Sequence, residues 1–290
     1  MTSLDTIERA YLDVMESNVT PDKLEVIAFG GYKMKSVEYA EILYNNEISS
    51  QIFEMCLFAP NVAKEAKAGQ FINIYTGLGE YILPRPISIN EIDIEKGTVT
   101  VVYQVIGKGT EFFSGLASGQ EIKILGPLGN GFDIRGGIKE HIVVGGGIGI
   151  PPLVELVKKL DGNVSVFLGA KSAPILSKRF EELGADVYIS SDDGSAGFKG
   201  NVIELIESVK PSGEMIYTCG PKVMLKSISK WAEERKIPIQ VSMEERMACG
   251  IGACVGCAVK IRKTGESEWQ NLKVCKDGPV FMGNEVVWDE

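Results

Sequence analysis

The sequence has one histidine, His141, among 290 residues, and its Lys and Arg residues form no cluster beyond scattered pairs. Its formal net charge is -9 at pH 7. A chain of this charge has no basic surface that could bind a phosphate backbone, so nucleic acid is excluded as a partner. A metal site of mixed Cys and His ligands would lack its second residue type, because the single histidine lies far from the cysteines.

Long hydrophobic runs are also missing. No apolar stretch reaches the length that spans a bilayer, and the first eighteen residues, MTSLDTIERAYLDVMESN, carry charges throughout, unlike a signal peptide. We therefore expect a cytoplasmic protein that has no membrane segment. In a reducing compartment, clustered cysteines indicate metal or redox chemistry more often than disulfides.

The pattern of the chain predicts four segments. Residues 4–17 place apolar side chains at helical spacing, so residues 1–34 are predicted to form an N-terminal helical extension. Residues 35–137 consist of short β-rich stretches divided by Gly, Pro and Asn, which predicts a closed or nearly closed antiparallel β-barrel. Residues 138–245 alternate buried strands with helical stretches, which predicts a parallel α/β domain, and residues 246–290 form a small cysteine-rich subdomain.

Four of the six cysteines lie in the last subdomain: Cys249, Cys254, Cys257 and Cys275. Their C-x4-C-x2-C spacing, followed by seventeen residues and the fourth cysteine, is the plant-type [2Fe-2S] pattern. The interspersed Gly250, Gly252 and Gly256 would let the backbone approach an inorganic core closely. Structural zinc is the alternative, although zinc sites usually have two paired-ligand clusters and only one C-x2-C pair exists here. Inert buried cysteines are a third possibility.

A glycine-rich turn, VVGGGIGIPP, spans residues 143–152. Its strand–turn–helix context is typical of a site where free N–H groups meet a pyrophosphate. The turn departs from the Rossmann fingerprint, because Ile150 stands where the third glycine would be and two prolines open the helix. A tight turn without a ligand therefore remains an alternative.

The barrel segment contains the stretch LPRPISIN, in which Arg85, Pro86 and Ser88 supply a fixed cation, a stiff backbone and a hydroxyl. This set suits a diphosphate, and Gly107, Gly109 and Thr110 downstream could clamp the same phosphates. Taken alone, an Arg-Pro pair is usually only a strand edge.

The order of these motifs, followed by GPLGNGF, the glycine turn and CGP at residues 219–221, resembles the ferredoxin-NADP reductase superfamily. In that superfamily a β-barrel holds a flavin and the next α/β domain holds a nicotinamide nucleotide. The resemblance covers residues 35–245. With EERMACGIGACVGCAV and VCKDGPVF it extends to the C-terminus and narrows to the electron transfer subunits of NAD-dependent class 1B dihydroorotate dehydrogenases.

This resemblance implies the cofactors FAD, [2Fe-2S] and NAD(H). The residues that it assigns to FAD are Arg85, Pro86, Ile87, Ser88, Val102, Tyr103, Gln104, Gly109 and Thr110. The cluster ligands that it assigns are Cys249, Cys254, Cys257 and Cys275. By analogy with the superfamily, the residues near NAD(H) are Gly145, Gly146, Gly147, Gly149, Cys219 and Gly220. The stretch before Cys275 is long and predicts an extended hairpin.

Other readings stay open for several of these side chains. Cys219 could be a small buried residue that ends a strand, and Cys56 reads as a core residue. Asp192 and Asp193 could favour NAD over NADP by binding a ribose hydroxyl, but a solvated turn fits them equally well.

The cofactor set predicts an electron relay, because a flavin converts between the two electrons of a hydride and the single electrons that an iron–sulfur cluster accepts. Such a relay requires no acid–base dyad. The resemblance implies a partner: an FMN-containing catalytic subunit that oxidises dihydroorotate, in a heterotetramer of two copies of each chain. One alternative is a flavin/iron–sulfur NAD(P)H reductase subunit of a hydrogenase or of a ferredoxin:NADP oxidoreductase. Another is a zinc-stabilised, non-catalytic nucleotide-binding module.

Overall fold

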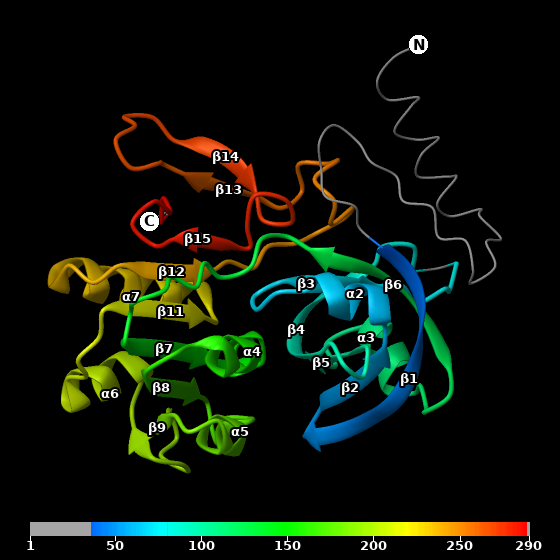
Figure 1. Cartoon of the computed structure of the whole chain (residues 1–290), viewed down its shortest axis with the longest axis horizontal. Coiled ribbons are helices and arrows are strands. Elements are labelled where there is room, and N and C mark those ends of the chain that lie inside the picture. The colour runs from blue at the N-terminus through cyan, green and yellow to red at the C-terminus, as the bar shows by residue number, and fades with distance from the viewer. Residues whose placement is uncertain (1–35, 80, 289–290) are drawn as a thin grey trace.

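The computed structural model describes residues 36–79 and 81–288, which form a barrel, a mainly parallel sheet with helices, and a C-terminal part that lies over both (Figure 1). The helix expected in the N-terminal extension lies outside the described residues. Among the described residues, no helix is long and apolar enough to cross a bilayer.

The expected antiparallel barrel is confirmed. Its strands close in the order β1-β2-β5-β4-β3-β6. They are β1 (Ser36–Ser49), β2 (Ile52–Phe58), β3 (Phe71–Ile74), β4 (Arg85–Asp93), β5 (Thr98–Gln104) and β6 (Glu121–Leu128), with the short helices α2 (Pro60–Glu65) and α3 (Lys108–Ser114). Side chains that alternate along each strand, such as Ile72 and Ile74, fill the interior.

The expected parallel α/β domain is also confirmed, with the strand order β10-β9-β8-β7-β11-β12-β15. Its strands are β7 (Glu140–Gly146), β8 (Asn163–Ala170), β9 (Asp186–Ser191), β10 (Phe198–Lys199), β11 (Met215–Cys219), β12 (Ile239–Ser242) and β15 (Val280–Met282). Its helices are the 3-10 turn η1 (Gly147–Gly149), α4 (Pro152–Lys159), α5 (Ser177–Glu182), α6 (Val202–Val209) and α7 (Lys222–Arg235). The central strands are apolar on both faces because helices cover them.

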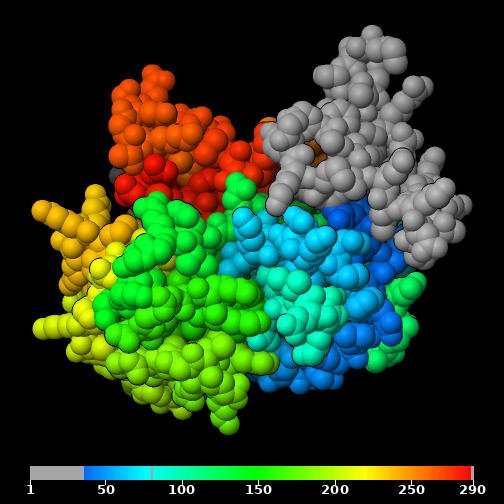
Figure 2. Space-filling model, in the orientation of Figure 1, coloured from blue at the N-terminus to red at the C-terminus, as the bar shows by residue number. Residues whose placement is uncertain are grey.

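The C-terminal part is built around a hairpin of β13 (Ala258–Ile261) and β14 (Gln270–Lys273), so the expected extended hairpin is confirmed. The strand β15 that follows it pairs antiparallel with β12 and adds an edge strand to the nucleotide sheet. Val259 and Phe281 of this part share one hydrophobic core with Val241 and Met243. The C-terminal part therefore packs as an extension of the sheet, and the space-filling view shows it as a lobe rising above the α/β domain (Figure 2).

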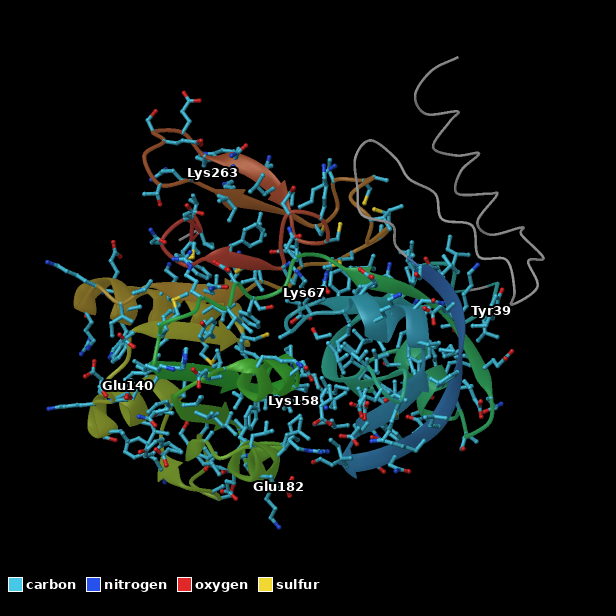
Figure 3. The ribbon with its side chains drawn as sticks, in the orientation of Figure 1. Tyr39, Lys67, Glu140, Lys158, Glu182 and Lys263 are labelled. Atoms are coloured by element: carbon cyan, nitrogen blue, oxygen red, sulfur yellow. The ribbon has the colours of Figure 1, made fainter. Side chains whose placement is uncertain are left out.

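A buried carboxylate joins the barrel to the sheet domain. Glu155 of α4 is fully buried, and its Oε2 accepts a hydrogen bond from the Ile92 N–H of β4 at 3.0 Å. Lys158, which Figure 3 labels at this boundary, donates from Nζ to the Ile92 carbonyl at 3.0 Å. Lys158 and Lys159 also place their Nζ atoms 3.4 Å from the two Glu155 oxygens. These contacts fix the helix after the glycine turn against the strand that begins with Arg85.

We expect Glu155→Ala to lower the free energy of unfolding by about 2 kcal/mol, because it removes charge-assisted hydrogen bonds across the domain boundary. Glu155→Gln keeps an acceptor for the Ile92 N–H and should cost less. Urea unfolding measures both changes, and Glu182→Ala on the exposed part of α5 is the control, with an expected change within about 0.5 kcal/mol. Equal stabilities of the Glu155→Ala and Glu182→Ala proteins would show that this contact does not join the domains.

Candidate functional site

The four predicted cluster cysteines converge. The Cys249 and Cys254 Sγ atoms are 3.3 Å apart, and Cys275 forms side-chain hydrogen bonds with both Cys249 and Cys257. Backbone N–H groups point at the sulfurs: Gly252 donates to Cys275 Sγ at 3.1 Å, and Cys254 donates to Cys249 Sγ at 3.3 Å. An irregular loop before β13 supplies three of these sulfurs, and the fourth follows β14.

Glycines shape this loop. Gly250 and Gly252 have φ angles of +68° and +82°, a region that side chains with a Cβ rarely adopt. The hydrogen bond with Cys275 lowers the pKa of the Cys249 thiol to about 4 and raises the pKa of Cys275, so a thiolate is stabilised within the group. Thiolates are the ligands that iron–sulfur clusters use.

The sulfurs lie in hydrogen-bond contact, and no group of three or more His, Cys, Asp or Glu side chains in residues 36–79 and 81–288 is arranged to hold a metal ion as it stands. The fit to a [2Fe-2S] cluster therefore rests on the donors: three thiols on a glycine-rich loop and a fourth after β14, with N–H groups directed at sulfur.

Two asparagines, one in the barrel and one just after it, bind the two segments that carry the cysteines. Asn73 of β3 donates from Nδ2 to the Cys249 carbonyl at 3.2 Å. Asn130 donates to the carbonyls of Lys276 and Asp277, each at 3.1 Å, and its backbone N–H donates to the Gly278 carbonyl at 2.6 Å. The GPLGNGF stretch, which contains Asn130, thus binds the CKDGP stretch that carries the fourth cysteine.

Sequence reasoning assigned no role to Asn73. A polar residue inside the otherwise apolar strand FINI was the available signal. It also missed Lys273, whose Nζ donates to the Gly252 carbonyl at 2.6 Å and brings a positive charge to the loop.

At the barrel, the structure brings Arg85 and Gly109 together. A Cβ added at Gly109 would lie 2.2 Å from Arg85 Nε, so the guanidinium covers the Gly109 backbone. Arg85 also lies 6.0 Å from the Tyr81 ring centroid and donates to the Leu83 carbonyl. The Thr110 hydroxyl accepts from the N–H groups of residues 106 and 107 at 3.0 and 3.2 Å, which shapes the start of α3. A cationic cradle for a diphosphate fits this arrangement.

The other residues expected at the flavin lie on β4 and β5. Pro86, Ile87 and Ser88 are partly exposed and follow Arg85 on β4, and Gln104 is exposed at the end of β5. Val102 is buried and is not part of the barrel core.

The Tyr103 side chain belongs to the barrel core. It is 1% exposed, its ring centroid lies 5.8 Å from that of Phe53 and 6.0 Å from that of Phe113, and its hydroxyl donates to Asn45 Oδ1 at 3.0 Å. Desolvation raises the pKa of the Tyr103 hydroxyl to about 12. Only the backbone of Tyr103 is therefore placed to contact a flavin outside the barrel.

The six residues expected at the nucleotide lie together at the carboxyl ends of β7 and β11. Gly145 and Cys219 are register partners in the sheet. A Cβ at Gly149 would lie 2.5 Å from Gly220 Cα, and a Cβ at Gly220 would lie 3.0 Å from Gly146 N, so the two turns touch through bare backbone. Gly147 has a φ of +54° and open space where a side chain would be. Ligands of open α/β sheets bind at such strand ends.

Two alternative readings gain support from the geometry. Cys219 is half-buried at the end of β11, and desolvation raises the pKa of its thiol to about 12, which disfavours the thiolate at neutral pH. Asp193 accepts from the Ser172 hydroxyl at 2.7 Å and from the Ser195 N–H at 2.8 Å, and these bonds lower its pKa to about 2. Asp193 therefore stabilises its own turn.

The three candidate sites meet on one side of the barrel. The glycine turn η1 lies against β5, and α4 packs on β4. The cysteine loop is bound to β3, the neighbour of β4 in the barrel. Strand β4, which carries the Arg85–Ser88 motif, thus lies in the barrel order between β5, against which the glycine turn packs, and β3, to which the cysteine loop is bound.

Comparisons with known proteins identify the family of the chain. Residues 244–287 match the family model described as the iron-sulfur cluster binding domain of dihydroorotate dehydrogenase B. The chain is 40% identical over 258 residues to the dihydroorotate dehydrogenase B (NAD(+)) electron transfer subunit of Caldanaerobacter subterraneus subsp. tengcongensis, covering 89% of this chain and 99% of that protein. The Streptococcus thermophilus subunit of the same name is 42% identical over 259 residues, covering 87% and 98%.

Solved structures show the same fold. A chain of the NADH-dependent reduced ferredoxin-NADP oxidoreductase superposes with a TM-score of 0.76 and 31% identity, covering 90% of this chain and 92% of that one. The Amycolatopsis cytochrome P450 reductase GcoB shares the fold at a TM-score of 0.58 and 20% identity, covering 70% and 67%. With its barrel, its glycine turn and its four gathered cysteines, the chain belongs to the family of dihydroorotate dehydrogenase B (NAD+) electron transfer subunits.

Proposed function

We propose that this chain is the electron transfer subunit of an NAD-dependent dihydroorotate dehydrogenase and carries electrons from the FMN of a catalytic subunit, through [2Fe-2S] and FAD, to NAD+ in pyrimidine biosynthesis. The observation that carries the proposal is the gathering of four cysteine sulfurs, three of them on a loop that is bound to the barrel through Asn73. Bound FAD supplies the conversion between single electrons and the two electrons of a hydride. The protein positions the cofactors relative to one another and tunes their reduction potentials through nearby charges and hydrogen bonds.

The proposal gives each group of residues a task. Cys249, Cys254, Cys257 and Cys275 hold the cluster. Arg85, Gly109 and Thr110 hold the FAD diphosphate. The remaining FAD contacts come from Pro86, Ile87 and Ser88 and from the β5 residues Val102, Tyr103 and Gln104, with Tyr103 contributing its backbone. The NAD(H) pyrophosphate and nicotinamide lie at Gly145, Gly146, Gly147, Gly149, Cys219 and Gly220.

The partner in this proposal is an FMN-containing catalytic subunit, with two copies of each chain in the complex. Two apolar side chains of the cysteine loop support a partner surface there: Ile251 is 44% exposed and Val255 is 75% exposed. We place the complex in the cytoplasm, since none of the six cysteines, all in the described residues, is paired in a disulfide.

One observation favours a second candidate, a reductase subunit of a ferredoxin:NADP oxidoreductase. The solved structure with a TM-score of 0.76 is of that kind, at 31% identity. The relatives at 40% and 42% identity are dihydroorotate dehydrogenase subunits and favour the first candidate. The match to an iron–sulfur cluster binding domain argues against a zinc-stabilised module.

Reconstitution with a partner separates the two candidates. The purified chain, loaded with FAD and iron–sulfur cluster, is mixed with an FMN-containing dihydroorotate dehydrogenase catalytic subunit from the same genome. The proposal predicts a stable complex that forms NADH from NAD+ when dihydroorotate is added. NADH formation that requires reduced ferredoxin, with no response to dihydroorotate, would support the second candidate instead.

We expect Cys254→Ser to abolish the electron paramagnetic resonance signal of the reduced cluster and to lower iron and sulfide content, because a hydroxyl is a poor substitute for a thiolate ligand. Bound FAD should still be bleached by NADH. Cys56→Ala, in β2 of the barrel, is the control and should keep the cluster signal. An unchanged signal in the Cys254→Ser protein would remove Cys254 from the ligand set.

We expect Gly109→Ala to weaken FAD binding about tenfold or more, equal to about 1.4 kcal/mol, because its Cβ would displace the Arg85 guanidinium. Fluorescence titration of apoprotein with FAD measures the change. Gly136→Ala, in the stretch between β6 and β7, is the control, because an added Cβ there meets no atom within 4 Å. Equal FAD affinities of the two variants would contradict the assignment of Arg85 and Gly109 to the diphosphate.

A further inference from the structure

Asn73 is a polar residue on the outer face of the barrel, at the point where β3 meets the cysteine loop. Its neighbours Ile72 and Ile74 point into the barrel core, so the alternation of β3 turns Asn73 outward. Its register partner on β4 is Pro86, and directly paired residues of antiparallel strands share a face. Asn73 therefore lies beside the motif assigned to FAD.

The Asn73 amide contacts the cysteine loop at its first proposed ligand. Nδ2 donates to the Cys249 carbonyl at 3.2 Å. The following residue, Gly250, has a φ of +68°, and a Cβ there would lie 2.2 Å from Asn73 Nδ2. The Asn73 amide can therefore approach the loop this closely only because residue 250 is glycine, and the loop backbone packs directly against the Asn73 side chain.

The other half of the amide has no partner. Asn73 is fully buried, and its Oδ1 receives no hydrogen bond from the protein. Buried polar atoms are nearly always paired, and an unpaired one costs stability that an apolar side chain of the same size would not. An acceptor of this kind, next to Pro86, suits a donor brought by a bound group.

We infer that Asn73 is a positioning residue for electron exchange between FAD and the cluster, an inference that rests on the proposed function. Its amide holds the Cys249 backbone against β3, which is paired with β4, and so fixes the separation of the two cofactors. Its N–H dipole also places a partial positive charge beside a ligand of a negatively charged cluster. Neighbouring donors of this kind stabilise the reduced cluster and raise its reduction potential.

The test uses the full chain loaded with FAD and cluster. Asn73→Leu removes the donor at nearly constant volume, and Asn73→Asp keeps the shape while replacing the donor with an acceptor. Asn130→Ala is the control, because it removes two hydrogen bonds to the same C-terminal part without touching a ligand residue. The readouts are a redox titration of the cluster signal and stopped-flow reduction by NADH, with separate rates for flavin bleaching and cluster reduction.

We expect Asn73→Leu and Asn73→Asp to shift the cluster potential to more negative values and to slow cluster reduction about fivefold or more. Flavin bleaching by NADH should stay within about twofold of wild type, since the nucleotide turn is untouched. Asn130→Ala should leave the potential in place. If Asn73→Leu loses the cluster, the potential of Asn73→Asp decides the question.

A wild-type potential and cluster-reduction rate in the Asn73 variants would overturn the inference. The same shift in Asn130→Ala would overturn it as well, because it would reflect general loosening of the C-terminal part. Failure of the proposed function has a different signature: the wild-type chain itself would bind no flavin or no cluster, or its cluster would not be reduced by NADH.

Discussion

Strand β4 is in contact with other elements at both of its ends, and the arrangement of the candidate sites depends on this constraint. At its start, Arg85 lies over Gly109 and forms the proposed diphosphate cradle. Near its end, Ile92 shares both of its backbone polar groups with α4, through Glu155 and Lys158. Because α4 begins directly after the glycine turn, a strand–helix contact places the nucleotide site relative to the flavin site. A buried carboxylate suits this task, since leaving either Ile92 group unpaired at a domain boundary would be costly.

On the other side of β4, the cysteine loop is held by short polar contacts. Asn73 binds the loop before the first bend and Asn130 binds it after the last cysteine, so the ends of the ligand set are fixed to the barrel while the middle remains accessible. Glycines with positive φ let the sulfurs and N–H groups face one another. A loop of this kind can enclose a cluster while presenting Ile251 and Val255 to a partner.

Features that depend on local chemistry could be predicted from the sequence. The spacing of Cys249, Cys254 and Cys257 predicts a cluster site, because ligand geometry requires particular residues at fixed separations. The glycine turn predicts a strand–turn–helix unit but leaves its ligand open. The barrel and the parallel sheet follow from hydrophobic patterning and punctuation. The hairpin before Cys275 could be expected from the length of its segment.

Features that depend on contacts between distant residues could not be predicted. The strand β15 joins β12 across some forty residues, and its three residues carry no strand signature of their own. The sequence does not show whether the Tyr103 side chain faces a flavin or the barrel core. Its packing against Phe53 and Phe113 inside the closed barrel shows that it faces the core. Glu155 and Asn73 look like an ordinary helix carboxylate and an isolated polar residue until the chain brings Ile92 and Cys249 to them.

The most direct test of the central claim is an anaerobic titration of the purified chain with NADH, followed by visible absorption and by electron paramagnetic resonance. The account predicts that flavin absorbance bleaches and that the signal of a reduced [2Fe-2S] cluster grows during the same titration. A colourless protein that contains stoichiometric zinc and no flavin, even after reconstitution, would contradict it.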